Sequence, residues 1–101
     1  RASAPRRITG MDELFGPYYF RFTVKDEPGV LASIAGVLSA QGISIASVIQ
    51  KGRRGQEAAV PLVILTHAAR ESDVEQALAR IGKLDAVLAP VVKIRILEQE
   101  Q

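Results

Sequence analysis

No charged residue occurs between Gly29 and Gln50, and this long uncharged segment limits the folds that the sequence can adopt. A segment of this length could cross a membrane, because a transmembrane helix needs about 20 predominantly apolar residues. Gln41 and Gly42 interrupt it, however, and Gly is typical of the position after a helix end. Beyond Gly42 the apolar residues occupy every second position, as in a strand. We therefore expect a helix followed by a strand, in a protein without a membrane span.

The residues before this segment predict a strand and a tight turn. Between Tyr18 and Lys25, apolar and polar side chains alternate, which is typical of a half-buried strand. Asp26 and Pro28 follow: an Asp side chain accepts hydrogen bonds from first-turn amides, and Pro fits the first helical position. The helix is expected from Gly29 to about residue 41. Its apolar face repeats every four residues: Val30, Ile34 and Leu38.

The second half of the chain predicts two more strands, a second helix and a last strand. Strands are expected at Ile43–Lys51 and Ala58–His67, joined by a turn rich in glycine and charge. Pro61 removes a ladder donor from the second of these, so we expect a bulge or a later start. Ser72 and Glu75 have the spacing of a capping box at the start of the second helix. The last strand is expected where three apolar residues alternate: Val92, Ile94 and Ile96.

The predicted order is strand, helix, strand, strand, helix, strand. With right-handed crossovers this order gives an α+β ferredoxin-like βαββαβ sandwich, in which a four-stranded antiparallel sheet carries both helices on one face. The first and third strands are expected in the centre, and the second and fourth at the edges. The domain is expected at residues 18–97, after a linker or arm at residues 1–17 and before a tail at residues 98–101. Because the chain does not begin with methionine, we expect it to be part of a longer protein.

The composition excludes several classes of function for this chain of 101 residues. It contains no cysteine, which rules out thiolate metal sites and disulfide scaffolds and favours the cytoplasm. The single histidine, His67, follows a predicted strand and lacks an orienting acid, so we expect it to be structural or on the surface. No dinucleotide or phosphate-loop motif occurs. We therefore expect no metal, no cofactor and no catalytic residue in the chain itself.

Nucleic-acid binding is not expected either. Lys and Arg number 13 against 11 Asp and Glu, so the charges are nearly balanced. A ferredoxin-like domain that binds RNA needs stacking aromatic side chains on its first and third strands. Tyr19 and Arg21 are expected on the open face of the first strand, but Ala58–His67 contains no Phe, Tyr or Trp.

The turn at Asp26–Leu31 is the most informative candidate site. The N-terminus of a helix presents free amide donors and a partial positive charge, both of which suit a carboxylate. Gly29 lets a ligand approach the backbone, and Asp26 offers a carboxylate to an ammonium group. These features could hold the two charged ends of a free amino acid. Alternatively, Asp26 only caps the helix and Gly29 only fits the turn.

Two features concern partner chains. The second strand would be an uncharged edge at Ile43–Gln50, and proteins seldom leave such an edge open. Pairing with a second copy of the chain would cover it. Small residues also recur every four positions on the first helix, which permits a close helix contact, either with a partner or with the second helix of the same domain: Ala32, Gly36 and Ala40.

These residues resemble a known family. Asp26-x-Pro28-Gly29-Val30-Leu31, followed by an apolar helix and Gly42-Ile43-Ser44-Ile45, is similar to the ACT domain, a small amino-acid-sensing module. Four longer segments resemble the C-terminal regulatory region of bacterial homoserine dehydrogenase: Tyr18 to Phe22, Ile43 to Gln50, Val60 to His67, and Ile94 to Ile96. The resemblance covers residues 10–97.

The resemblance implies a parent enzyme that interconverts aspartate semialdehyde and homoserine with NAD(P), through residues outside this chain. In the ACT family, effectors bind between paired domains, at the first strand–helix loop of one and the second strand of the other. The implied effector-binding residues come from both segments: Asp26, Gly29, Val30 and Leu31, with Ser44, Ile45 and Gln50. Some amino-acid-binding ACT domains carry Asn at the position of Ser44 and a polar residue at that of Val24, so this chain departs from their pattern.

The resulting hypothesis is a regulatory domain that forms a homo-oligomer through its edge strand and binds a free amino acid, with threonine as the expected effector. Two alternatives remain open at this stage. The chain could be a dimerisation module without an effector, or an ACT domain from another parent, such as an acetolactate synthase regulatory subunit or a transcription regulator.

Overall fold

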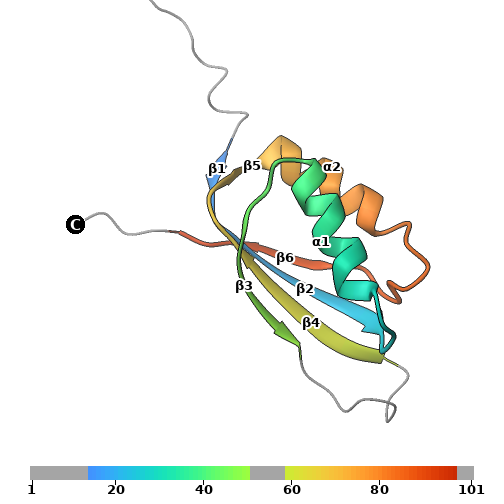
Figure 1. Cartoon of the computed structure of the whole chain (residues 1–101). Helices are drawn as coiled ribbons and strands as arrows, with labels where there is room; N and C mark the ends of the chain where they lie inside the picture. Colours follow the sequence, from blue (N-terminus) through green and yellow to red (C-terminus); the bar gives the residue numbers. More distant parts are fainter. Residues whose placement is uncertain (1–13, 51–58, 98–101) are drawn as a thin grey trace, which may run out of the picture.

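The computed structural model describes residues 14–50 and 59–97, which form one antiparallel sheet with two helices on one face (Figure 1). The strands lie in the order β3-β4-β2-β6. Their bounds are Tyr18–Lys25 for β2, Ile45–Gln50 for β3, Ala59–Thr66 for β4 and Val92–Arg95 for β6. The helices are α1 at Val30–Ala40 and α2 at Glu71–Ile81. The ferredoxin-like fold and the predicted strand order are therefore confirmed.

The core lies between the helices and one face of the sheet. Alternate residues of β2 are fully buried, and Phe20 and Phe22 pair with Ile64 and Leu62 of β4. The helices cover this face with the side chains that recur at helical spacing: Val30, Ile34 and Leu38 from α1, and Val74, Ala77 and Ile81 from α2. Arg21 is exposed on the opposite face, as expected.

The two helix starts differ from the sequence prediction. Helix α1 begins at Val30 after Gly29, whose φ of 86° is left-handed, so Pro28 lies in the turn and is not the first helical residue. Helix α2 begins at Glu71 with Arg70 as its N-cap and no side-chain cap. Ser72 therefore lies inside the first turn and does not begin the helix as the cap of a capping box.

The strand ends also differ by a few residues. Strand β4 runs through Pro61, which pairs with Thr23 of β2, and the irregularity of the sheet lies elsewhere, between Ile45 and Ser47 of β3. Pro61 stands one residue beyond the last described β3–β4 pair, Gln50 with Leu62, so the loss of its ladder donor interrupts no described pair with β3. The predicted strand ends at positions 51 and 58 lie outside the described residues.

Two short strands were not predicted. Phe15–Gly16 forms β1 and pairs with β5, Ala69–Arg70, while the amide of Glu71 donates to the carbonyl of Leu14 at 2.8 Å. This bond supplies an acceptor for the first amide of α2, which has none within the helix. Phe15 and Gly16, which fall within the predicted linker at residues 1–17, thus form a strand paired with the segment before α2. Residues 1–13 and 98–101 lie outside the described part.

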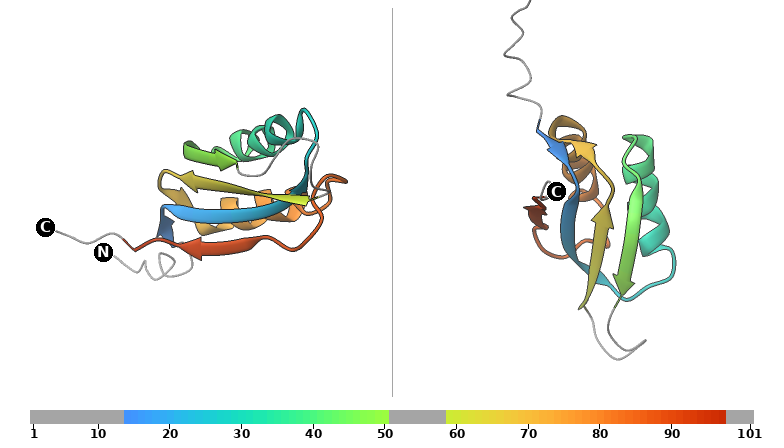
Figure 2. Two further views of the ribbon diagram at one scale, coloured as in Figure 1. Left: turned by 90° about the horizontal axis from the view of Figure 1, so that it is seen from below. Right: turned by 90° about the vertical axis from the view of Figure 1, so that its left-hand side faces the viewer.

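Helix α1 leaves one side uncovered. Ala32, Gly36 and Ala40 are exposed, so the alternative that these small residues pack against α2 does not hold. In the right-hand view of Figure 2, α1 and the edge strand β3 lie on the same side of the domain, while α2 lies on the other. Among the described residues, no helix is long and apolar enough to span a membrane.

Candidate functional site

The turn between β2 and α1 forms one wall of a pocket of about 310 Å³. This wall consists of Glu27, Pro28, Gly29, Val30 and Ser33, and the opposite wall is the segment Leu84–Ala86. Gly29 is needed here because its φ is positive, a conformation that other residues rarely adopt. Lack of space is not the reason, since a Cβ at this position would meet nothing within 4 Å. The turn therefore depends on backbone conformation and leaves open space above it.

The opposite wall is held against β2 by main-chain bonds. The amide of Lys25 donates to the carbonyl of Ala86, and the amide of Leu88 donates to the carbonyl of Thr23, both at 2.8 Å. The Lys25 ammonium lies 3.5 Å from a carboxylate oxygen of Asp85, whose side chain is fully exposed. Residues about 60 positions apart in the sequence thus face each other across the pocket.

The α1 end of this pocket suits an anion. The amide of Ser33 donates to the carbonyl of Gly29 at 2.9 Å, so the amides of Val30, Leu31 and Ala32 have no acceptor within the helix. Gly29 has no side chain with which to cap them, and the first turn of α1 contains no acidic residue. Such amides, together with the partial positive charge of a helix N-terminus, have the chemistry that a carboxylate accepts hydrogen bonds from.

Comparison with known proteins shows the family to which this fold and turn belong. The family model of the ACT domain matches residues 18–86. The chain belongs to the ACT domain family. The match includes β2, the turn, both helices and the segment that forms the opposite wall of the pocket.

Among the proteins similar in sequence to this domain are homoserine dehydrogenases. The ACT domain is 43% identical over 79 residues to the homoserine dehydrogenase of Pseudomonas aeruginosa, covering 78% of this chain and 18% of that enzyme. It is 44% identical over 89 residues to the enzyme of Neisseria gonorrhoeae, covering 88% of this chain and 20% of that enzyme. The chain thus spans about a fifth of the length of these relatives.

Solved structures agree in fold. The crystal structure of a homoserine dehydrogenase from Thiobacillus denitrificans matches with a TM-score of 0.74 and 38% identity, over 84% of this chain and 18% of that one. The ACT domain of a GTP pyrophosphokinase from Chlorobium tepidum matches with a TM-score of 0.63 over 80% of this chain and 100% of that one, but at 14% identity it supports the fold alone.

The structure brings only some of the predicted effector-binding residues of the ACT domain together. Gly29 and Val30 line the pocket, and the half-buried Asp26 directly precedes it. Leu31 packs partly against the core. The three residues predicted on the second strand, Ser44, Ile45 and Gln50, do not line this pocket. Within one ACT domain the two predicted groups therefore do not form a single site.

Sequence reasoning missed the wall formed by Leu84–Ala86. The residues between α2 and β6 show no clear periodicity, which indicates a loop but does not indicate where in the fold that loop lies. Its place depends on main-chain bonds to Thr23 and Lys25, and such long-range pairing has no local sequence signal.

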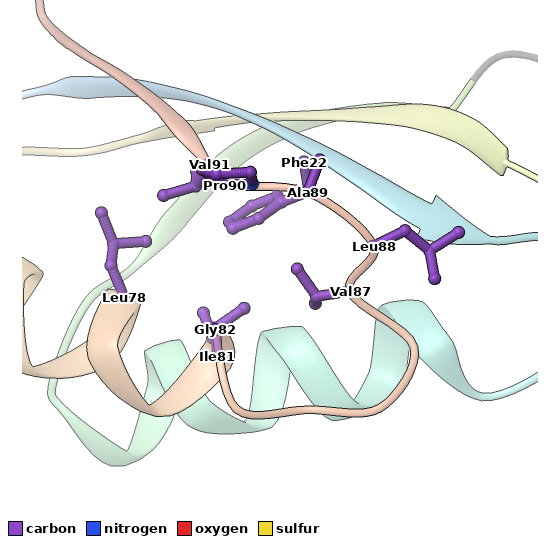
Figure 3. Close-up of a pocket in the computed structure, with 9 residues that line it drawn as sticks. All are labelled: Phe22, Leu78, Ile81, Gly82, Val87, Leu88, Ala89, Pro90 and Val91. Carbon is purple, nitrogen blue, oxygen red and sulfur yellow. The ribbon is translucent and has the colours of Figure 1, made fainter.

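A second cavity of about 310 Å³ lies under the same loop, beside the C-terminal end of α2 (Figure 3). Val24 bridges to Val87 and Arg21 pairs with Val92, so two residues of β2 lie opposite the four residues 88–91. The segment of residues 88–91 therefore bulges away from β2, and the cavity lies beneath it. Its lining has no titratable side chain: Phe22, Leu78, Ile81, Gly82, Val87, Leu88, Ala89, Pro90 and Val91. It therefore offers no acid, base or nucleophile.

Proposed function

We propose that this ACT domain is the amino-acid-sensing regulatory domain of a homoserine dehydrogenase and that its effector is threonine. The observation that carries the proposal is the pocket between the α1 N-terminus and Leu84–Ala86, in a domain that matches about a fifth of the length of each of two homoserine dehydrogenases. The parent enzyme would interconvert aspartate semialdehyde and homoserine. NAD(P) and the catalytic residues would be held by parts of the polypeptide outside this chain.

The chemistry of the pocket fits a free amino acid. An effector carboxylate would accept hydrogen bonds from the amides at the start of α1. Its ammonium group would lie near the carboxylate of Asp26, with Glu27 and Asp85 adding negative charge at the rim. An uncharged effector side chain would contact Val30 and Leu31.

A second copy of the domain would complete the site. Strand β3 is an edge strand without charge, and it lies on the same side as the exposed small residues of α1 (Figure 2). Pairing of two β3 strands would satisfy the free edge and bring the two α1 helices into contact at Gly36. Ser44, Ile45 and Gln50 of one copy would then approach the turn of the other.

An effector bound between two copies would stabilise one arrangement of the pair. This bias would reach the catalytic part of the enzyme only if threonine binds the two arrangements with different affinity. Tight binding with equal affinity for both would change nothing.

The test is calorimetric titration of threonine, isoleucine and serine into the 101-residue chain, with sedimentation before and after. We expect heat with threonine and none after Asp26→Asn. Asp73→Asn, which alters an acid in the first turn of α2, is the matched control and should bind normally. Silence with all three amino acids would contradict a sensing role.

One observation favours a second candidate, a dimerisation module without an effector. The side chain of Val24, where some amino-acid-binding ACT domains carry a polar residue, is fully buried in the core and cannot contact a ligand. In that case sedimentation would show a dimer whose stability does not respond to amino acids.

A further inference from the structure

The face of the sheet opposite the helices carries two rows of mostly apolar side chains, one of which is interrupted by Arg21. Directly paired residues in antiparallel strands point to the same face. The pairs Ile49–Val63 and Arg21–Val92 therefore place one row across all four strands, because Val63 also pairs with Arg21. A second row runs from Leu65 through Tyr19 to Ile94.

The edges of these rows are open to solvent. Ile49 is 44% exposed, Val92 is 47% exposed and Ile94 is 52% exposed. Nothing in the described part of the chain covers them, since both helices lie on the other face (Figure 1). Half-buried Val63 and Leu65 of β4 lie between these two exposed edges. Apolar side chains gathered on one face in this way are typical of interaction surfaces.

The charges on this face indicate what the partner must carry. Arg21 lies in the middle of the first row, while Lys25, further along the same strand, lies 3.5 Å from the Asp85 carboxylate. None of the strands β2, β3, β4 and β6 contains an acidic residue. A second copy packed on this face would set cations against cations, whereas a surface with a carboxylate over Arg21 would be complementary.

The relatives show where such a surface could come from. The ACT domain matches 18% and 20% of two homoserine dehydrogenases, so most of each polypeptide lies outside the matched region. The carbonyl of Pro17 accepts a bond of 2.9 Å from the amide of Ile96, so the chain enters the domain beside the β6 edge of this face. Exposed Phe15 and Leu97 flank this entry.

We propose that the open sheet face docks onto another part of the homoserine dehydrogenase polypeptide, an apolar surface that places a carboxylate against Arg21. This inference rests on the proposed function only in assigning the domain to a longer dehydrogenase. It does not require an effector, so failure of threonine binding would leave it standing.

The test uses cysteine labelling, because the chain contains no cysteine of its own. Ile94→Cys places a thiol on the face, and Ala79→Cys places a control thiol on the exposed side of α2. Each is labelled with a maleimide in the 101-residue chain and in the P. aeruginosa enzyme whose 79 matched residues are replaced by this domain. Mass spectrometry of the peptide that contains the new cysteine separates it from cysteines of the host enzyme.

We expect labelling at position 94 to be slower by about tenfold or more in an active chimera than in the isolated chain, with no change at position 79. Arg21→Glu should restore fast labelling at position 94, and Arg21→Lys should not. If the chimera lacks dehydrogenase activity, the same comparison is made with the chain added to the host enzyme truncated before the matched residues.

Two results would overturn the proposal. Equal labelling rates at position 94 in the chimera and the isolated chain would show that the face stays uncovered. Protection that already occurs in the isolated chain, and rises with its concentration, would assign the face to a second copy.

Discussion

The Lys93 side chain on β6 donates a hydrogen bond to the Glu75 carboxylate on α2 and joins the edge strand to the helix layer. Lys93 pairs with Phe20, so its side chain points toward the helices, while Val92 and Ile94 point to the open face. The hydrogen bond that Lys93 donates to Glu75 raises the pKa of Lys93 above its ordinary value of 10.5, although burial acts in the opposite direction.

Lys93→Met should lower the free energy of unfolding by about 0.2–1 kcal/mol, because both partners are partly exposed. Since the pKa is raised in the folded state, this contribution is full below pH 10.5 and is lost as pH rises through the folded value. Urea unfolding of the wild type, Lys93→Met, Glu75→Gln and the double variant would measure the coupling. Coupling that persists unchanged at about pH 12 would contradict this assignment.

Tyr18→Phe should leave the domain at least as stable as the wild type. The Tyr18 hydroxyl is buried and has no hydrogen-bond partner among the described residues, so its removal relieves a desolvation cost of about 1–3 kcal/mol. Burial, with a contribution from Glu71, raises the pKa of Tyr18 above 10.0, so the wild type should lose stability above that pH. The variant should lose less in thermal melts above pH 10.0. If Tyr18→Phe clearly destabilised the domain at neutral pH, the Tyr18 hydroxyl would have to make a hydrogen bond in the folded state, contrary to this prediction.

Gly29→Ala should destabilise the domain by about 1 kcal/mol, because φ is 86° at this position and a side chain is strained there. Gly36→Ala is the matched control. It lies inside α1 with open space around its Cβ position, so we expect about 0.5–1 kcal/mol of added stability. Chemical denaturation of the monomer, at low concentration, measures both. Equal effects of the two substitutions would contradict the conformational explanation.

Thr66→Val should cost about 1–3 kcal/mol. The buried Thr66 hydroxyl accepts a bond of 3.0 Å from the Tyr18 amide and donates one of 2.7 Å to the His67 carbonyl, so the isosteric change leaves two main-chain groups without this partner. Thr23→Val, on the open face, is the control and should change stability little. Thermal unfolding and exchange of the Tyr18 amide would report the loss, and an unchanged exchange rate would contradict it.

Much of the fold could be predicted because its local patterns agree with the tertiary arrangement. Alternation in β2 and four-residue spacing in α1 both identified side chains that are buried in the structure, such as Phe22 and Ile34. The turn at Gly29 and the helix stop at Gly42 were also predicted, and both residues have a positive φ. These features depend on neighbours within a few positions, so the sequence states them directly.

The sequence by itself therefore determined the order of the two helices and the four strands of the main sheet, the core faces of β2 and α1, and the turn that forms half of the pocket. Only the tertiary structure decided that Leu84–Ala86 forms the other half, that β1 pairs with β5, and that Val92 and Ile94 face outward while Lys93 reaches α2. Alternation shows that a strand has two faces, but pairing with a distant strand decides which of them meets the helices.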